Sequence, residues 1–169
     1  MKAFLRRRIA TPLLALLSRG VAPDRLALSV AIGIVVGNIP ILGVSTALCT
    51  LIALAFGLNL AAVQLAQAAM APTQILLIIP FVRLGEWLTH APPQPLSVAG
   101  DLALIAHGAG RAMIVLWRAI LHAGLAWLLV APAAIYVLYK TLTPVFTRAA
   151  AALGARARAE PIRGPDDRA

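Results

Sequence analysis

The chain has 169 residues, of which 61% are apolar and only 12% are charged, whereas soluble proteins average roughly 45–50% and about 25%. The 57 residues Leu26–Val82 contain no charged side chain. A soluble fold returns its chain to water between elements, and about 20 apolar residues already span the hydrocarbon of a bilayer. The composition therefore argues against a soluble domain and predicts an integral membrane protein. The single cysteine, Cys49, excludes an intrachain disulfide.

The net charge of +9 is carried at the two ends of the chain. Of the 15 Lys and Arg residues, six precede the apolar run and six follow the last apolar segment. The positive-inside rule produces this distribution without any nucleic acid, and no nucleic-acid-binding motif accompanies it. We expect both termini in the cytoplasm, contact with anionic lipid headgroups and no nucleic-acid partner.

Glycine and proline residues, which interrupt helices, divide the chain into short helical segments. Residues 1–25 read as a basic cytoplasmic lead-in, 26–142 as a helical membrane domain, and 143–169 as a basic cytoplasmic tail that is disordered from about Glu160. Within the membrane domain the predicted segments are Leu26–Asn38, Ile41–Gly57, Leu60–Val82 with a break at Pro72, a short interfacial helix at Val98–Arg111, and Trp117–Tyr139. The last segment has 23 residues and is about 35 Å long, enough to cross a membrane.

The first segment is too short for an ordinary crossing and the second is marginal, and Asn38-Ile39-Pro40 separates them. The spacing predicts a re-entrant or tightly folded helical hairpin, in which Asn38 caps the first helix or has a left-handed backbone, and Pro40 or Ile41 opens the second. Gly43, Ser45 and Thr46 then lie in the first turns of the second helix. An interrupted backbone in hydrocarbon must be buried in protein or line a wet cavity.

Gly33 and Gly37 form a pair of small residues that lets another helix approach closely. Structural packing is one interpretation of the glycines and of the break. The other is a ligand site of the kind that transporters build from discontinuous helices.

Gln64, Gln67 and Gln74 share one face of a helix that Pro72 interrupts. Such a face should not meet lipid, so the glutamines either bond neighbouring helices together or form the polar wall of a substrate cavity. Arg83 and Glu86 follow at a spacing of three, which indicates an interfacial ion pair or, alternatively, recognition of a headgroup or substrate.

The sequence predicts neither a metal site nor a cofactor. The three histidines are 17 and 15 residues apart along the chain, which is not a metal-ligand spacing. No nucleophile and base can be paired from the sparse carboxylates. We therefore expect a protein that is not an enzyme.

Several of these residues together resemble a bacterial membrane family, the domain-of-unknown-function family 2062 (DUF2062). The resemblance covers about Val21–Leu88 and rests on three places: a motif of small residues and a proline, an asparagine before the next helix, and a proline break followed by Leu-Gly. The residues of the first place are Ser29, Gly33, Gly37, Pro40 and Gly43, the asparagine is Asn59, and the break is Pro72 with Leu84-Gly85 downstream. Many members have Asn-Pro where this chain has Ala71-Pro72. Membership implies a bacterial inner-membrane protein without an assigned activity. Because some relatives join the domain to a glycosyltransferase, it also implies a link to envelope precursors.

Two functional hypotheses follow. The first is a small transporter or a protein that handles lipids or envelope precursors, with a polar site at the broken helices. The second is a membrane scaffold that anchors an envelope-biosynthesis enzyme. We also expect a homo-oligomer, because a few short helices have difficulty enclosing the glutamine face.

Overall fold

The computed structural model describes residues 11–18, 20–41, 43–92 and 109–159. Every regular element in these ranges is an α-helix, which confirms the all-helical prediction. The helices are α2 (Thr11–Ser18), α3 (Pro23–Gly37), α4 (Val44–Ala55), α5 (Leu60–Ala69), α6 (Ala71–Thr89) and α8 (Ala109–Ala159). The interfacial helix predicted at Val98–Arg111 falls largely outside the described residues, as does the tail from Glu160.

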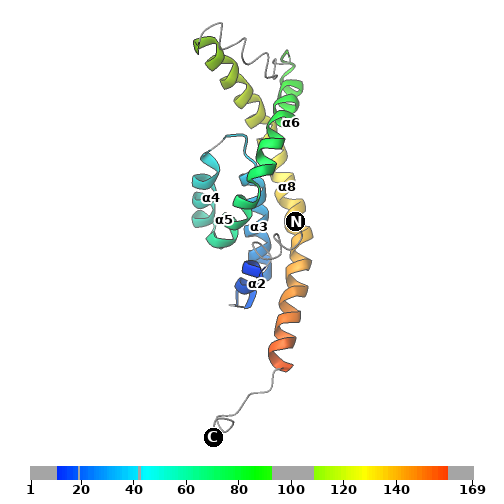
Figure 1. Cartoon of the computed structure of the whole chain (residues 1–169). Coiled ribbons are helices and arrows are strands. Elements are labelled where there is room, and N and C mark those ends of the chain that lie inside the picture. The colour runs from blue at the N-terminus through cyan, green and yellow to red at the C-terminus, as the bar shows by residue number, and fades with distance from the viewer. Residues whose placement is uncertain (1–10, 19, 42, 93–108, 160–169) are drawn as a thin grey trace.

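Helix α3 is the centre of the bundle (Figure 1). It makes its most extensive contacts with α8 on one side and α5 on the other, and it also contacts α4 and α2. Because α3 has neighbours on several sides, many of its apolar side chains are buried, and Leu26 and Ala27 are fully buried. Helix α6 leads away from α5 and packs along α8.

Three clusters of buried apolar side chains hold these helices together, the third of which packs Val82 of α6 against Ala119 and Ala123 of α8. The first joins α2, α3, α5 and α8, and its largest members are Leu13, Leu17, Leu26 and Phe146. The second joins α3, α4 and α5 through Ile32, Val36, Cys49, Ala53 and Val63. Cys49 is thus a buried packing residue, as its place in the apolar run suggests.

Within the described residues, one helix is long and apolar enough by itself to cross a membrane, over Ile114–Ala155. Helices α5 and α6 meet the same criterion only as a pair, and they are bent by 65° at their junction. The core helix of a soluble protein can meet the same criterion of length and hydropathy, but such a helix is mostly buried. Only 17% of the most apolar stretch of α8 is buried. The fold therefore supports membrane association through α8.

Several helix boundaries differ from the sequence prediction. The second helix begins at Val44 rather than at Pro40 or Ile41, because Gly43 has a left-handed backbone with φ of 86° that no α-helix can include. The break placed at Pro72 lies at Met70, since proline is tolerated in the first turn of α6 and the helix starts ahead of it. Helix α8 continues past Tyr139 and Pro144 to Ala159.

Candidate functional site

The break between α3 and α4 is a buried polar turn. Asn38 follows the last residue of α3, and its Nδ2 donates a hydrogen bond to the Ile34 carbonyl at 2.8 Å. The side chain therefore caps the helix, and the expectation of a left-handed backbone is wrong, because φ is −96° and ψ is 12°. Asn38 is only 8% exposed, and its Oδ1 has no hydrogen-bond partner among the described residues. A buried carbonyl oxygen without a donor is unusual and asks for an explanation.

The two glycines of α3 allow α5 to lie almost against its backbone. A Cβ added at Gly33 would collide with the Val63 carbonyl and would lie 2.7 Å from the Cβ of Ala66. At Gly37 it would lie 3.0 Å from the Cα of Gln67. The glycine pair thus packs within one chain, and it positions Gln67 beside the end of α3.

The glutamines of α5 bond to the first turns of α4. Gln64 Nε2 donates to Thr50 Oγ1 at 2.8 Å and to the Thr46 carbonyl at 3.2 Å. Gln67 Nε2 lies 3.2 Å from Ser45 Oγ and 3.4 Å from Thr46 Oγ1. Both side chains therefore link α5 to α4, as the interpretation of the glutamines as interhelical bonds requires.

Gln74 reaches the same region from α6. The bend at Met70 directs α6 away from the axis of α5, and Gln74 Nε2 donates to the Ile39 carbonyl at 2.7 Å. This bond is buried and supplies a donor to a carbonyl in the turn, where no helical partner exists. Pro72, in the first turn of α6, needs no hydrogen-bond donor there. We call the turn and its polar neighbours the break cluster: Asn38, Ile39, Ser45, Thr46, Gln64, Gln67 and Gln74.

The break cluster contains no titratable side chain. It offers amide and hydroxyl groups in an apolar surround, which suits hydrogen bonding to a neutral polar group and not proton transfer. Its three glutamine nitrogens already donate within the chain. Asn38 Oδ1 is a fully buried acceptor of this cluster that has no hydrogen-bond partner among the described residues.

Arg83 and Glu86 form the predicted ion pair, with Arg83 Nη1 2.9 Å from Glu86 Oε2. Glu86 is 4% exposed, whereas the Arg83 side chain is 44% exposed. Twelve residues, about 18 Å of helix, separate Glu86 from Gln74, so the pair does not belong to the break cluster. It lies instead where α6 packs on α8, beside Gly85, and a Cβ at Gly85 would lie 2.8 Å from the Cα of His122.

Two long-range contacts went unnoticed in the sequence. Ser29 Oγ accepts a hydrogen bond from the Asn59 backbone N–H at 3.1 Å and donates to the Arg25 carbonyl at 2.7 Å. Asn59 in turn caps α5 by accepting from the Ala62 N–H at 2.9 Å. Trp127 Nε1 donates to the Val35 carbonyl at 3.0 Å, which ties α8 to the end of α3. Ser29 and Asn59 both stand in the family motif, and that was the one signal for their pairing.

Among the described residues, no group of three or more His, Cys, Asp or Glu side chains is placed to hold a metal ion.

The comparisons with known proteins give one match. The profile of a family described as uncharacterized protein conserved in bacteria (DUF2062) matches residues 6–152. The match takes in α2 to α6 and most of α8, and so extends well beyond the stretch of about 21–88 in which the motifs lie. No curated protein and no solved structure matches the chain.

Proposed function

The chain belongs to DUF2062, a bacterial family of uncharacterized proteins, and from that premise we propose that it is a multi-pass protein of the inner membrane that binds a polar substrate at the break cluster. It acts as a small transporter or as a protein that handles lipids or envelope precursors. Both termini lie in the cytoplasm, and binding rather than catalysis is its task.

The apolar surface supports the membrane part of this proposal. Leu54, Leu76 and Leu129 are 65–74% exposed on three different helices. Monomeric soluble proteins seldom expose large contiguous apolar patches, whereas hydrocarbon solvates such side chains well. The clusters of Lys and Arg at both ends of the chain orient the termini toward the cytoplasm.

The lengths of the helices support a re-entrant placement of α3 and α4. With 15 and 12 residues, they are about 22 and 18 Å long, less than the roughly 30 Å of hydrocarbon. A turn inside the membrane needs internal partners for its backbone groups. Gln74 supplies one of them by donating to the Ile39 carbonyl.

The unpaired Asn38 Oδ1 is the observation that carries the binding proposal. Leaving a buried carbonyl oxygen without a donor costs about 1–3 kcal/mol. A substrate that brings a hydroxyl or an amide N–H to this atom recovers that free energy. Sugars and peptide-like groups of envelope precursors carry such donors, and the uncharged break cluster suits them.

A specific observation favours the alternative, a membrane scaffold for an envelope-biosynthesis enzyme. The glutamine nitrogens donate to groups of the same chain, which stiffens the turn and leaves few polar groups for a substrate. The same finding changes the argument for a homo-oligomer, because one chain satisfies the glutamine nitrogens. We keep the homo-oligomer as a proposal without assigning a contact surface to it.

Native mass spectrometry of the protein purified in mild detergent tests the proposal. We expect the wild type to carry a co-purified adduct, which Asn38→Leu loses because the acceptor is gone. Thr50→Val is the matched control: it removes a hydrogen bond to Gln64, leaves Asn38 intact, and should keep the adduct. A wild type without an adduct other than phospholipid, or such an adduct that survives Asn38→Leu, would contradict binding at this site. An adduct-free protein that cross-links to an envelope enzyme would favour the scaffold.

A further inference from the structure

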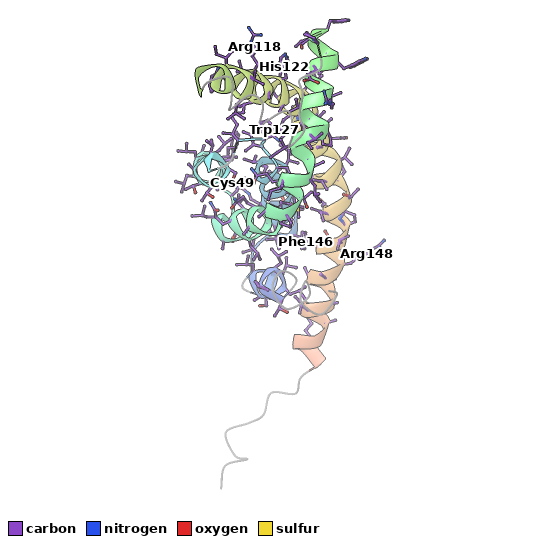
Figure 2. All side chains as sticks on the ribbon, turned by 45° about the horizontal axis from the view of Figure 1, so that its top comes forward. Cys49, Arg118, His122, Trp127, Phe146 and Arg148 are labelled. Carbon is purple, nitrogen blue, oxygen red and sulfur yellow. The ribbon has the colours of Figure 1, made fainter. Side chains whose placement is uncertain are left out.

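A groove lies on α8 toward the C-terminal end of the span Ile114–Ala155, away from the break cluster. Its volume is about 350 Å³, and it is lined by Tyr139, Lys140, Thr143, Pro144, Thr147 and Arg148. All of these residues belong to one helix, and Figure 2 shows Arg148 on the side of α8 that faces away from the other helices. Phe146, in contrast, is buried against α2 and α3. The groove is therefore on an outer face of the bundle.

Two cations flank the groove, with Pro144 between them. Lys140 and Arg148 are both exposed, and eight residues of helix separate them by about 12 Å along the axis. Their long side chains can converge on one group above Pro144 if Lys140 turns away from Tyr136, over whose ring its Nζ lies. Helix α8 contains no Asp or Glu, so no acidic residue of this helix neutralises them. Lys140 Nζ lies 5.7 Å from the ring centroid of Tyr136, one turn away.

The two threonine hydroxyl groups of the groove are already engaged as donors. Thr143 Oγ1 donates to the Tyr139 carbonyl at 2.7 Å, and Thr147 Oγ1 donates to the Thr143 carbonyl at 2.9 Å. An anion in the groove would consequently be held by the two cations. Pro144 lacks an N–H, so it deprives the Lys140 carbonyl of its usual helical donor. This acceptor lies between the cations and suits a ligand that carries a hydroxyl group.

We propose that this groove binds the phosphodiester headgroup of an anionic glycerophospholipid, with the phosphate between Lys140 and Arg148. Phosphatidylglycerol fits best, since its glycerol hydroxyl can donate to the Lys140 carbonyl. This inference rests on the membrane placement proposed above and is independent of the substrate at the break cluster.

The apolar surface next to the groove favours a lipid over a free phosphate ion. Towards the middle of α8, Val137 and Leu129 are exposed, and Val145 is exposed within the groove's own length. Acyl chains can lie along Val137 and Leu129 while the phosphate stays at the cations. A free phosphate would gain nothing from these side chains. The arrangement also matches the end of a membrane span, where basic residues meet headgroups.

Lipid titration monitored by native mass spectrometry tests the site. The purified full chain is mixed with phosphatidylglycerol, with phosphatidylcholine, or with phosphatidylglycerol and excess inorganic phosphate. We expect the wild type to bind phosphatidylglycerol at least tenfold more tightly than the doubly substituted Lys140→Gln, Arg148→Gln protein. The control, Arg118→Gln with Arg158→Gln, removes the same charge from exposed positions on α8 outside the groove and should bind like the wild type. Lys140→Arg should retain binding.

The outcomes test the lipid site on α8 separately from the proposed membrane placement. Equal binding by the groove variant and the control variant overturns the site. Displacement by inorganic phosphate, or equal affinity for phosphatidylcholine, overturns the assignment to an anionic lipid. Carbonate extraction of cell membranes is run in parallel, and release of the wild-type protein into the soluble fraction would overturn the membrane premise together with the site.

Discussion

The amide nitrogen of Gln74 lies 2.7 Å from the carbonyl oxygen of Ile39, across 35 residues of sequence. This hydrogen bond joins the start of α6 to the turn between α3 and α4. Both residues are buried, so water does not substitute for the glutamine if it is removed. The turn and the bend at Met70 therefore depend on each other, although each is marked in the sequence by its own proline.

Replacing Gln74 by leucine should destabilise the protein by about 1–3 kcal/mol, because the buried Ile39 carbonyl loses its donor. Thermal unfolding of the purified protein in detergent measures the change. Gln64→Leu is the control, since Gln64 bonds partly exposed groups on α4 and its loss should cost only about 0.6 kcal/mol. Equal losses of stability in the two variants would show that the Gln74 hydrogen bond stabilises the protein no more than the Gln64 bonds do.

Gly33→Ala should destabilise the protein by about 1–3 kcal/mol, as overpacking does in a well-packed core. The added methyl group collides with the backbone of α5 at Val63, which cannot move without separating the two helices. In Gly124→Ala the new Cβ meets nothing within 4 Å, so that control should be neutral or slightly stabilising. The unfolding temperatures of both variants give the comparison, and a stable Gly33→Ala protein would mean that α3 and α5 do not pack this closely.

Gly43→Ala should cost about 1–2 kcal/mol, because the residue before α4 has a left-handed backbone. The space around it is open, so the loss comes from the backbone and not from a collision. Gly154→Ala, in the open part of α8, is the control and should not destabilise. A loss of stability shared by both variants would count against the backbone explanation.

Removing the break altogether should abolish function. In the double variant Pro40→Ala, Gly43→Ala, both residues that prevent a continuous helix at the turn are gone. The variant is expressed in a strain that lacks the native gene, and a phenotype of that deletion is scored. Normal complementation by a folded double variant would show that the break is not needed.

The orientation of the chain is testable by reporter fusion. With both termini in the cytoplasm, alkaline phosphatase fused after Ala169 should be inactive, whereas green fluorescent protein at the same position should fluoresce. The reason is the excess of Lys and Arg at both ends of the chain. Strong phosphatase activity would place the C-terminus in the periplasm and reject the proposed topology.

Local patterns in the sequence were sufficient wherever neighbours along one helix decide the outcome. The spacing of Arg83 and Glu86 predicted their ion pair, because residues three apart meet on a helix surface. The cluster of Gly and Pro residues predicted a turn at Asn38–Pro40, and α3 ends one residue before Asn38, at Gly37. The apolar composition predicted α8 as a long apolar helix. It did not predict the extension to Ala159, for which alanine-rich composition and the packing of Phe146 on α2 and α3 provide the reason.

The sequence by itself determined which polar side chains stand within apolar helices. The tertiary structure decided which hydrogen-bond partner each of these side chains has. Nothing local distinguishes Gln74, which bonds the turn, from Gln64, which bonds α4. The choice depends on the 65° bend between α5 and α6, and the bend depends on contacts of α6 with α8, such as that of Gly85 with His122. Residues 30 or more positions apart meet only after the helices pack, so the bond from Asn59 to Ser29 and the unpaired oxygen of Asn38 are consequences of the whole bundle.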